Sequence, residues 1–66
     1  MKIEFNGQPR TVPSGATVAA LLDELKLIPK HVAVEVNLNL IPRERHASHQ
    51  LRDGDVVEVV TLVGGG

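Results

Sequence analysis

One segment of this chain has the apolar spacing of a helix, and it limits the folds that the chain can adopt. The apolar stripe consists of Val18, Leu21, Leu22 and Leu25, at positions i, i+3, i+4 and i+7. Apolar residues with this spacing lie along one side of a helix. Thr17 is the expected N-cap, and we expect Pro29 to end the helix. Because one helix covers only one face of a sheet, the rest of the 66 residues should form a sheet whose other face is open.

Two short strands are predicted before the helix. Residues 1–5 alternate between apolar and polar side chains, which is typical of a half-buried strand, and the Asn6-Gly7 pair that follows favours a tight hairpin turn. We expect the return strand at residues 10–12. Pro9 cannot donate a backbone hydrogen bond, so its place at the start of this strand favours the edge of a sheet.

Three further strands are predicted after the helix. Residues 32–36 alternate, residues 37–39 favour a turn, and residues 40–41 form a short strand. Residues 43–50 are polar and predict a loop or one helical turn. The element order is therefore ββαβββ, which defines one small α+β domain over residues 1–63.

The last predicted strand is apolar on both of its sides. It follows a turn at residues 53–55 and covers residues 56–63. A strand of this kind is typical of the middle of a sheet. The alternation places Val57 and Val59 under the helix. The residues then left on the open face are Val56, Val60 and Leu62. We expect this uncovered apolar face to be a partner-docking surface.

The composition narrows the classes of function. The formal net charge is −1, and the chain has one Phe and no Trp or Tyr, so it offers neither a basic surface nor stacking side chains to a nucleic acid. No apolar run approaches the ~20 residues of a membrane-spanning helix, and residues 1–7 lack the apolar centre of a signal peptide. We therefore expect a cytoplasmic protein that binds neither nucleic acid nor membrane.

The cysteine and histidine content argues against a redox or metal centre. The chain has no cysteine, which excludes disulfide bonds, cysteine-ligated zinc and a thiol nucleophile of its own. Any sulfur chemistry must therefore use sulfur delivered from elsewhere. His46 and His49 could share one face of a helical turn, but without a nearby carboxylate or thiolate they make a weak metal site. We interpret them as solvated loop side chains and expect neither a metal nor a bound cofactor.

Two kinds of charged cluster have ordinary structural interpretations. The basic cluster consists of Arg43, Arg45 and Arg52 around Glu44. It could face an acidic partner, but solvated surface charges are the favoured interpretation. The acidic pairs are Asp23 with Glu24 and Asp53 with Asp55. General acid–base catalysis would need a pocket, and a one-helix domain of 66 residues has little room for one, so we interpret both pairs as structural.

Gly64, Gly65 and Gly66 directly follow the last predicted strand. Glycine lacks a Cβ atom, so this tail is thin and flexible and can enter a narrow channel in another protein. Three extended residues reach only about 10 Å, so that protein must also hold the sheet close to its active site. The α-carboxylate of Gly66 is ionised at neutral pH and can attack the α-phosphate of ATP to form an acyl-adenylate. A persulfide can then displace AMP and leave a thiocarboxylate, which is a good sulfur nucleophile.

A glycine run at this place has two other interpretations. A phosphate-binding loop requires a helix after its glycines, which this arrangement does not provide. A frayed terminus stays open as an interpretation, because chain termini are commonly disordered. The position directly after a central strand favours the reactive tail.

The order and spacing of these segments resemble those of one family. The chain is similar to the ubiquitin-like β-grasp sulfur carriers, and most of all to the thiamine-biosynthesis carriers of the ThiS family. The matching segments are FNG at residues 5–7, TVAALLDEL at 17–25, AVEVNLNLIPR at 33–43, LRDGD at 51–55 and VEVVTLVGGG at 57–66. The resemblance implies a mixed four- to five-stranded sheet with one helix packed on one face. The chain departs from it at His46, where some family members carry a bulky aromatic residue.

For function, the resemblance implies a sulfur carrier that is not itself an enzyme. An E1-like adenylyltransferase (ThiF-like) would adenylate Gly66 with ATP and Mg²⁺, and a cysteine desulfurase or sulfurtransferase would supply the sulfur. The thiocarboxylate would then donate sulfur to a thiazole synthase (ThiG-like) that builds the thiazole of thiamine. The glycine tail would enter the active sites of these partners, while the open face of the last strand would contact their surfaces.

Two alternatives to the thiamine carrier remain open. The same chemistry could serve molybdopterin synthesis or tRNA thiolation, although residues 37–43 resemble those carriers less. A ubiquitin-like protein modifier, whose tail forms an amide with a lysine, is the second alternative. The fold is common to all of these proteins and therefore does not separate them.

Overall fold

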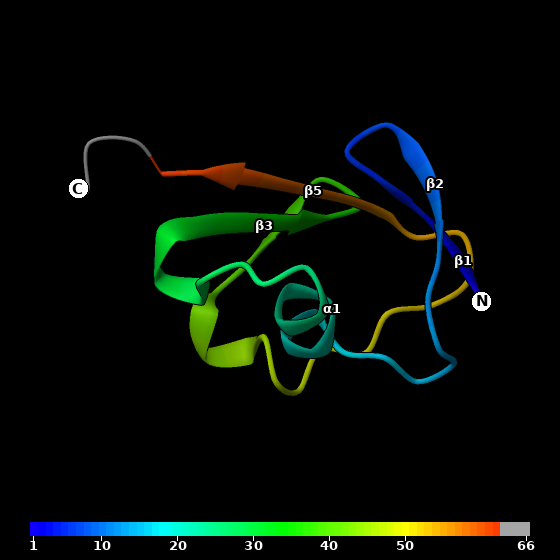
Figure 1. Ribbon diagram of the computed structural model, residues 1–66, viewed down its shortest axis with the longest axis horizontal. Coiled ribbons are helices and arrows are strands. Elements are labelled where there is room, and N and C mark those ends of the chain that lie inside the picture. The colour runs from blue at the N-terminus through cyan, green and yellow to red at the C-terminus, as the bar shows by residue number, and fades with distance from the viewer. Residues whose placement is uncertain (63–66) are drawn as a thin grey trace.

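The computed structural model describes residues 1–62, which form one mixed sheet covered on one face by a helix (Figure 1). The strands are β1 (Lys2–Phe5), β2 (Gln8–Thr11), β3 (Val32–Val36), β4 (Asn39–Ile41) and β5 (Val56–Thr61). The helical elements are α1 (Val18–Glu24) and the short 3-10 helices η1 (Pro29–His31) and η2 (Arg43–Arg45). The strand order in the sheet is β2-β1-β5-β3-β4, in which β1 and β5 are parallel and the other pairs are antiparallel. The predicted ββαβββ order and the central last strand are confirmed.

Both hairpins are closed by two residues with left-handed backbone conformation. Asn6 and Gly7 have φ angles of 48° and 82°, and Asn37 and Leu38 have φ angles of 52° and 70°. Two successive positive φ angles match the right-handed twist of the flanking strands. This tight turn starts the pairing at once, so β2 begins at Gln8 and not at residue 10 as predicted. β2 is an edge strand, as predicted from the proline within it.

The helix begins where the sequence predicts and ends earlier than predicted. The Thr17 hydroxyl accepts a hydrogen bond of 3.1 Å from the Ala20 amide, which confirms the N-cap. Pro29 does not end the helix; it starts η1 instead. The helix ends before Lys26, whose φ angle of 59° takes the chain out of the helical path.

Two backbone hydrogen bonds define this C-terminal cap. The Leu27 amide donates to the Leu22 carbonyl oxygen at 2.9 Å, and the Lys26 amide donates to the Asp23 carbonyl oxygen at 3.0 Å. This pair of bonds is the Schellman motif, in which the left-handed position is most often glycine. A lysine at that position carries the steric strain of a left-handed residue with a Cβ atom.

The core lies between α1 and one face of the sheet. Its buried side chains are Ile3, Val12, Val18, Leu21, Leu22, Val32, Val34, Val36, Ile41, Leu51, Val57 and Val59. Along β5 the burial alternates as predicted, because Val57 and Val59 are buried while Val56 and Val60 are exposed. Aliphatic side chains therefore supply the whole of this buried set, with Phe5 only partly buried beside it.

His46 contradicts the prediction of a solvated loop histidine. Its side chain is only 4% exposed, and its Nε2 lies 3.1 Å from the Ile41 carbonyl oxygen. The loop around it is docked onto the start of α1, where the Ala19 amide donates to the His46 carbonyl oxygen and the Val18 amide to that of His49. The first amides of a helix have no partner inside the helix, so this loop satisfies them and buries His46 in the process.

The two faces of β5 can be compared by truncating one side chain on each. We expect Val57→Ala to lower the free energy of unfolding by about 2–3 kcal/mol, because it removes buried methyl groups and leaves a cavity. Val60→Ala, on the exposed face of the same strand, should change it by less than about 0.5 kcal/mol. Urea unfolding followed by circular dichroism measures both values. Equal losses for the two variants would contradict this assignment of faces.

Replacement of Lys26, which has a left-handed backbone conformation, should stabilise the domain. We expect Lys26→Gly to raise the free energy of unfolding by about 0.5–1 kcal/mol, because glycine adopts the left-handed conformation without strain. Lys30→Gly is the matched control: Lys30 is also an exposed lysine but lacks a positive φ angle, so glycine there should destabilise the domain. Thermal unfolding of both variants gives the comparison. A destabilising effect of Lys26→Gly would refute the strain argument.

Candidate functional site

The predicted reactive group lies beyond the end of β5. β5 crosses the sheet and ends on the side of the molecule away from the N-terminus (Figure 1). Gly64, Gly65 and Gly66 lie outside the described residues, so the tail and its attachment site stay predictions. The structure does define what precedes the tail: a central strand held by neighbours on both sides up to Val59.

The side chain of Asn6 holds β5 on its β1 side. Its Oδ1 accepts from the Val59 amide at 2.8 Å, and its Nδ2 donates to the Val59 carbonyl oxygen at 3.1 Å. The backbone amide of Asn6 also donates to the Val57 carbonyl oxygen at 2.9 Å. β1 itself pairs with β5 only at Val56 and Val57. The amide side chain therefore takes the place of the next residue of β1 and extends the pairing to Val59.

Asn37 holds the start of β5 on its β3 side in a similar way. Its Oδ1 accepts from the Val56 amide at 2.9 Å, and its own backbone amide donates to the Val56 carbonyl oxygen at 2.7 Å. Its Nδ2 donates to Asp55 Oδ1 at 3.0 Å, and Asp55 Oδ2 accepts from the Arg52 amide at 2.8 Å. The side chain of Asn37 is thus bonded to both residues at the point where β5 begins.

The two asparagines together fix the register of β5, and the register decides where the tail starts. A shift of one residue would turn every side chain of β5 to the opposite face. Sequence reasoning treated Asn6 and Asn37 only as turn residues and missed these bonds. The available signal was that each is the first residue of a two-residue turn, where the side chain of a left-handed asparagine can reach the neighbouring strand.

The open face of the sheet carries the predicted docking residues. Val56, Val60 and Leu62 are 37%, 58% and 50% exposed. Leu40, on β4, is 64% exposed and extends the apolar area, although it was not among the predicted docking residues. The predicted exposure is confirmed, and the docking role remains a prediction.

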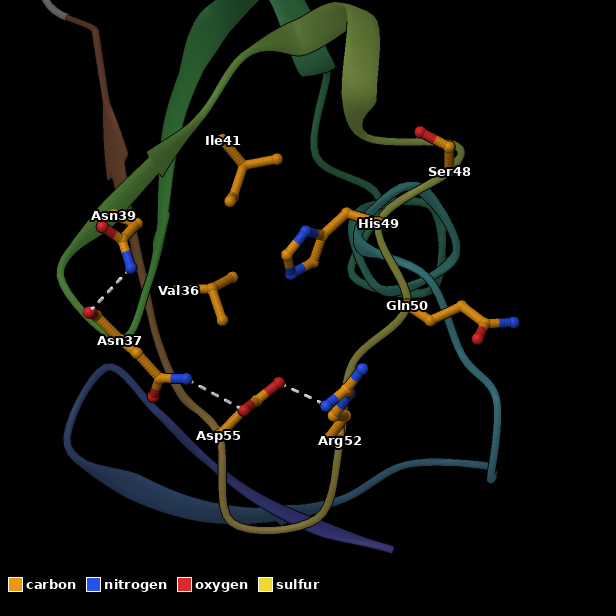
Figure 2. A pocket seen from close by; sticks show the side chains of 9 residues that line it. All are labelled: Val36, Asn37, Asn39, Ile41, Ser48, His49, Gln50, Arg52 and Asp55. Carbon is orange, nitrogen blue, oxygen red and sulfur yellow. Dashed lines mark hydrogen bonds between the residues drawn. The ribbon is translucent and has the colours of Figure 1, made fainter.

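A hollow at the other end of β5 corrects the expectation that the domain has little room for a pocket. Its volume is about 460 Å³. The residues that line it are Val36, Asn37, Asn39, Ile41, Ser48, His49, Gln50, Arg52 and Asp55 (Figure 2). The His49 ring points toward Val36 and Ile41, while Asn37 and Asp55 are already bonded to each other. The hollow lies beside the start of β5, at the opposite end of the strand from Thr61.

Several of the other charged residues make structural contacts. Asp53 Oδ1 accepts from the Lys2 amide at 2.8 Å, and Glu24 forms an ion pair of 2.9 Å with Arg10.

Among residues 1–62, no group of three or more His, Cys, Asp or Glu side chains is placed to bind a metal. Arg43 and Arg45 are exposed on η2. In the same part of the chain, no helix combines the length and apolar character needed to cross a bilayer.

These features define the class of the protein. A five-stranded mixed sheet in the order ββαβββ, with one helix across one face and the last strand in the centre, is the ubiquitin-like β-grasp fold. Within that class the chain belongs to the ThiS family, whose sequence model matches residues 3–66.

Three relatives illustrate the similarity. The sulfur carrier protein ThiS of Escherichia coli (strain K12) is 35% identical over 66 residues, which are the whole of both chains. The crystal structure of the thiamine biosynthesis protein (ThiS) from Geobacter metallireducens superposes with a TM-score of 0.86 at 36% identity and covers 100% of both chains. A thiazole synthase of Paramagnetospirillum magneticum is 42% identical over the same 66 residues, but this chain spans only 20% of its length.

The contribution of the Asn6 side chain can be isolated with glycine, which keeps the left-handed turn. We expect Asn6→Gly to lower the free energy of unfolding by about 1–2 kcal/mol, because two hydrogen bonds to Val59 are lost. The Val59 amide should also exchange its hydrogen faster. Asn39→Ala is the control, because its side chain makes one long contact of 3.4 Å to the Asn37 carbonyl oxygen. Unchanged stability and unchanged hydrogen exchange at Val59 in Asn6→Gly would show that the Asn6 side chain does not hold β5.

Proposed function

We propose that this protein is a sulfur carrier of thiamine biosynthesis and that the carboxylate of Gly66 is the group that carries the sulfur. The observation that carries the proposal is the end-to-end match to the sulfur carrier protein ThiS of Escherichia coli over all 66 residues. The matched fold, at a TM-score of 0.86, supports the same assignment. Gly66 is the last residue of the matched family segment.

The chemistry needs activation because a carboxylate is a poor electrophile. In the proposed first step, the Gly66 carboxylate attacks the α-phosphate of ATP on a ThiF-like adenylyltransferase, with Mg²⁺, and pyrophosphate leaves. A persulfide then displaces AMP and forms an acyl disulfide. A thiol of the relay then attacks the outer sulfur of this disulfide, which breaks the S–S bond and forms a new disulfide between the two relay sulfurs. The sulfur bonded to the acyl group stays on the carrier as a thiocarboxylate. The chain has no cysteine, so both the sulfur and the thiol come from other proteins.

In this scheme the carrier is a co-substrate and not a catalyst. Its own residues place the tail: β5 is fixed in register by Asn6 and Asn37, and the glycines after Val63 present a carboxylate without side chains around it. A tail that reaches about 10 Å can enter the active site of a partner only if that partner also binds the domain. Val56, Val60 and Leu62 are the proposed contact residues.

The proposed partners are supported by different kinds of evidence. The relative from Paramagnetospirillum magneticum is named thiazole synthase, and a segment similar to this chain makes up a fifth of it, which supports a ThiG-like acceptor. The adenylyltransferase and a cysteine desulfurase or sulfurtransferase follow from the chemistry proposed above. Because the cycle consumes ATP, we place it in the cytoplasm.

Deletion of Gly66 tests the attachment site. We expect the variant to fold normally and to lose adenylation and thiocarboxylate formation completely, because the activated carboxylate is displaced by one residue. Incubation with ATP, a desulfurase and the adenylyltransferase, followed by alkylation and mass spectrometry of the intact chain, measures the product. Alkylation is needed because oxidation of Met1 gives nearly the same nominal mass as replacement of oxygen by sulfur.

The matched control is Leu38→Asn, which changes an exposed residue in the turn at the other end of β5 and should leave the alkylated product at the wild-type level. A wild-type chain without an alkylatable terminus after full incubation would refute the carrier function. Thiamine auxotrophy on deletion of the gene separates this function from molybdopterin synthesis and tRNA thiolation.

A further inference from the structure

Two carboxylates stand directly opposite each other in the middle of the sheet. Glu35 on β3 is paired with Glu58 on β5, and these strands are neighbours in the order β2-β1-β5-β3-β4. Both side chains lie on the open face, because the buried valines of β3 and β5 alternate with them. Glu58 is exposed and Glu35 is partly buried.

The pair has no cation within the described part of the chain. Like charges that face each other across two strands destabilise a sheet. The ion pair formed within residues 1–62 is Arg10 with Glu24, and neither Glu35 nor Glu58 takes part in one. The register therefore places two like charges opposite each other near the centre of the sheet, where two apolar residues would pair well.

Apolar side chains surround the two carboxylates. Leu40 is paired with Glu35 across β3 and β4. Val56 and Val60 stand two residues before and after Glu58 on β5, so they share its face. All three apolar side chains are at least 37% exposed. The open face thus combines an apolar surface with a negative charge at its centre.

We propose that Glu35 and Glu58 bind one arginine or lysine that a thiazole synthase presents within an apolar patch of its own surface. This inference rests on the proposed function and names the chemistry of its partner. A cation placed between the two carboxylates removes their repulsion, and an arginine can donate to both of them. The surrounding apolar contacts exclude water and lower the local dielectric, which strengthens the charge interaction.

Two observations favour a thiazole synthase as the occupant of this face. A segment similar to this chain makes up a fifth of the thiazole synthase of Paramagnetospirillum magneticum, so a similar domain and a thiazole synthase occur in one polypeptide there. The apolar area also extends to the end of β5, because Leu62, two residues after Val60, is 50% exposed. A partner that covers this face therefore binds the domain close to the end of β5, which the short tail follows in the sequence.

Glu58→Gln and Glu35→Gln test the proposal, with the purified thiazole synthase of the same organism as the probe. We expect each variant to bind it at least about 10-fold more weakly in titration calorimetry, with a flatter dependence of affinity on salt concentration. The midpoint of thermal unfolding of the free variant should rise by about 1–6 °C, because the repulsion is gone. Weaker binding together with higher stability is a combination that a purely structural role does not produce.

Glu44→Gln is the matched control. It makes the same change of charge at an exposed residue of η2, which lies on the α1 side of the sheet (Figure 1), and it should bind like the wild type. The proposal is overturned if Glu58→Gln binds as tightly as Glu44→Gln, or if the wild type does not bind the thiazole synthase. It is also overturned if titration with MgCl₂ reveals a Mg²⁺ site that Glu58→Gln abolishes without any effect on binding to the enzyme.

The alkylation assay on the wild type separates this inference from the proposed function. If the wild type forms the thiocarboxylate while the glutamate variants bind normally, the charge-recognition proposal fails and the carrier function stands. If the thiocarboxylate is absent, the carrier function itself fails.

Discussion

The pairing of β5 between β1 and β3 is the interaction on which the rest of this structure depends. β5 contributes Val57 and Val59 to the core under α1, and it carries the chain out of the domain toward the glycine tail. Its direct pairing with β1 is short, and the Asn6 side chain extends it by bonding both backbone groups of Val59. Without this support, the strand that presents the tail would be held mainly by β3.

The single helix makes the two faces of the sheet different. It buries one side of the sheet and leaves the other side, with Val56 and Val60, exposed. On that open side the register pairs Glu35 with Glu58, and a pairing of like charges is unfavourable in a sheet. A chain of 66 residues buries a limited fraction of its surface, so its margin of stability is narrow. The binding role proposed for Glu35 and Glu58 would account for this pairing, because functional sites often oppose stability.

Much of the fold could be predicted because local patterns and long-range packing agree. The helical stripe, the Asn6-Gly7 turn and the alternation along β5 each indicate a structure that the tertiary fold retains. The end of α1 could not be predicted, because a left-handed Lys26 has no sequence signature and Pro29 was the stronger local signal. The burial of His46 was missed for a related reason: a polar loop became buried because the first amides of α1 needed carbonyl partners.

The sequence by itself determined the element order, the central place of the last strand and the glycine tail after it, because these follow from side-chain periodicity and from the lack of a Cβ atom. Only the tertiary structure decided which residues face each other. It brought Asn6 to Val59, Asn37 to Val56 and Glu35 to Glu58, pairs that lie far apart along the chain. The register of paired strands sets such contacts, and register is a property of two strands together that neither segment specifies alone.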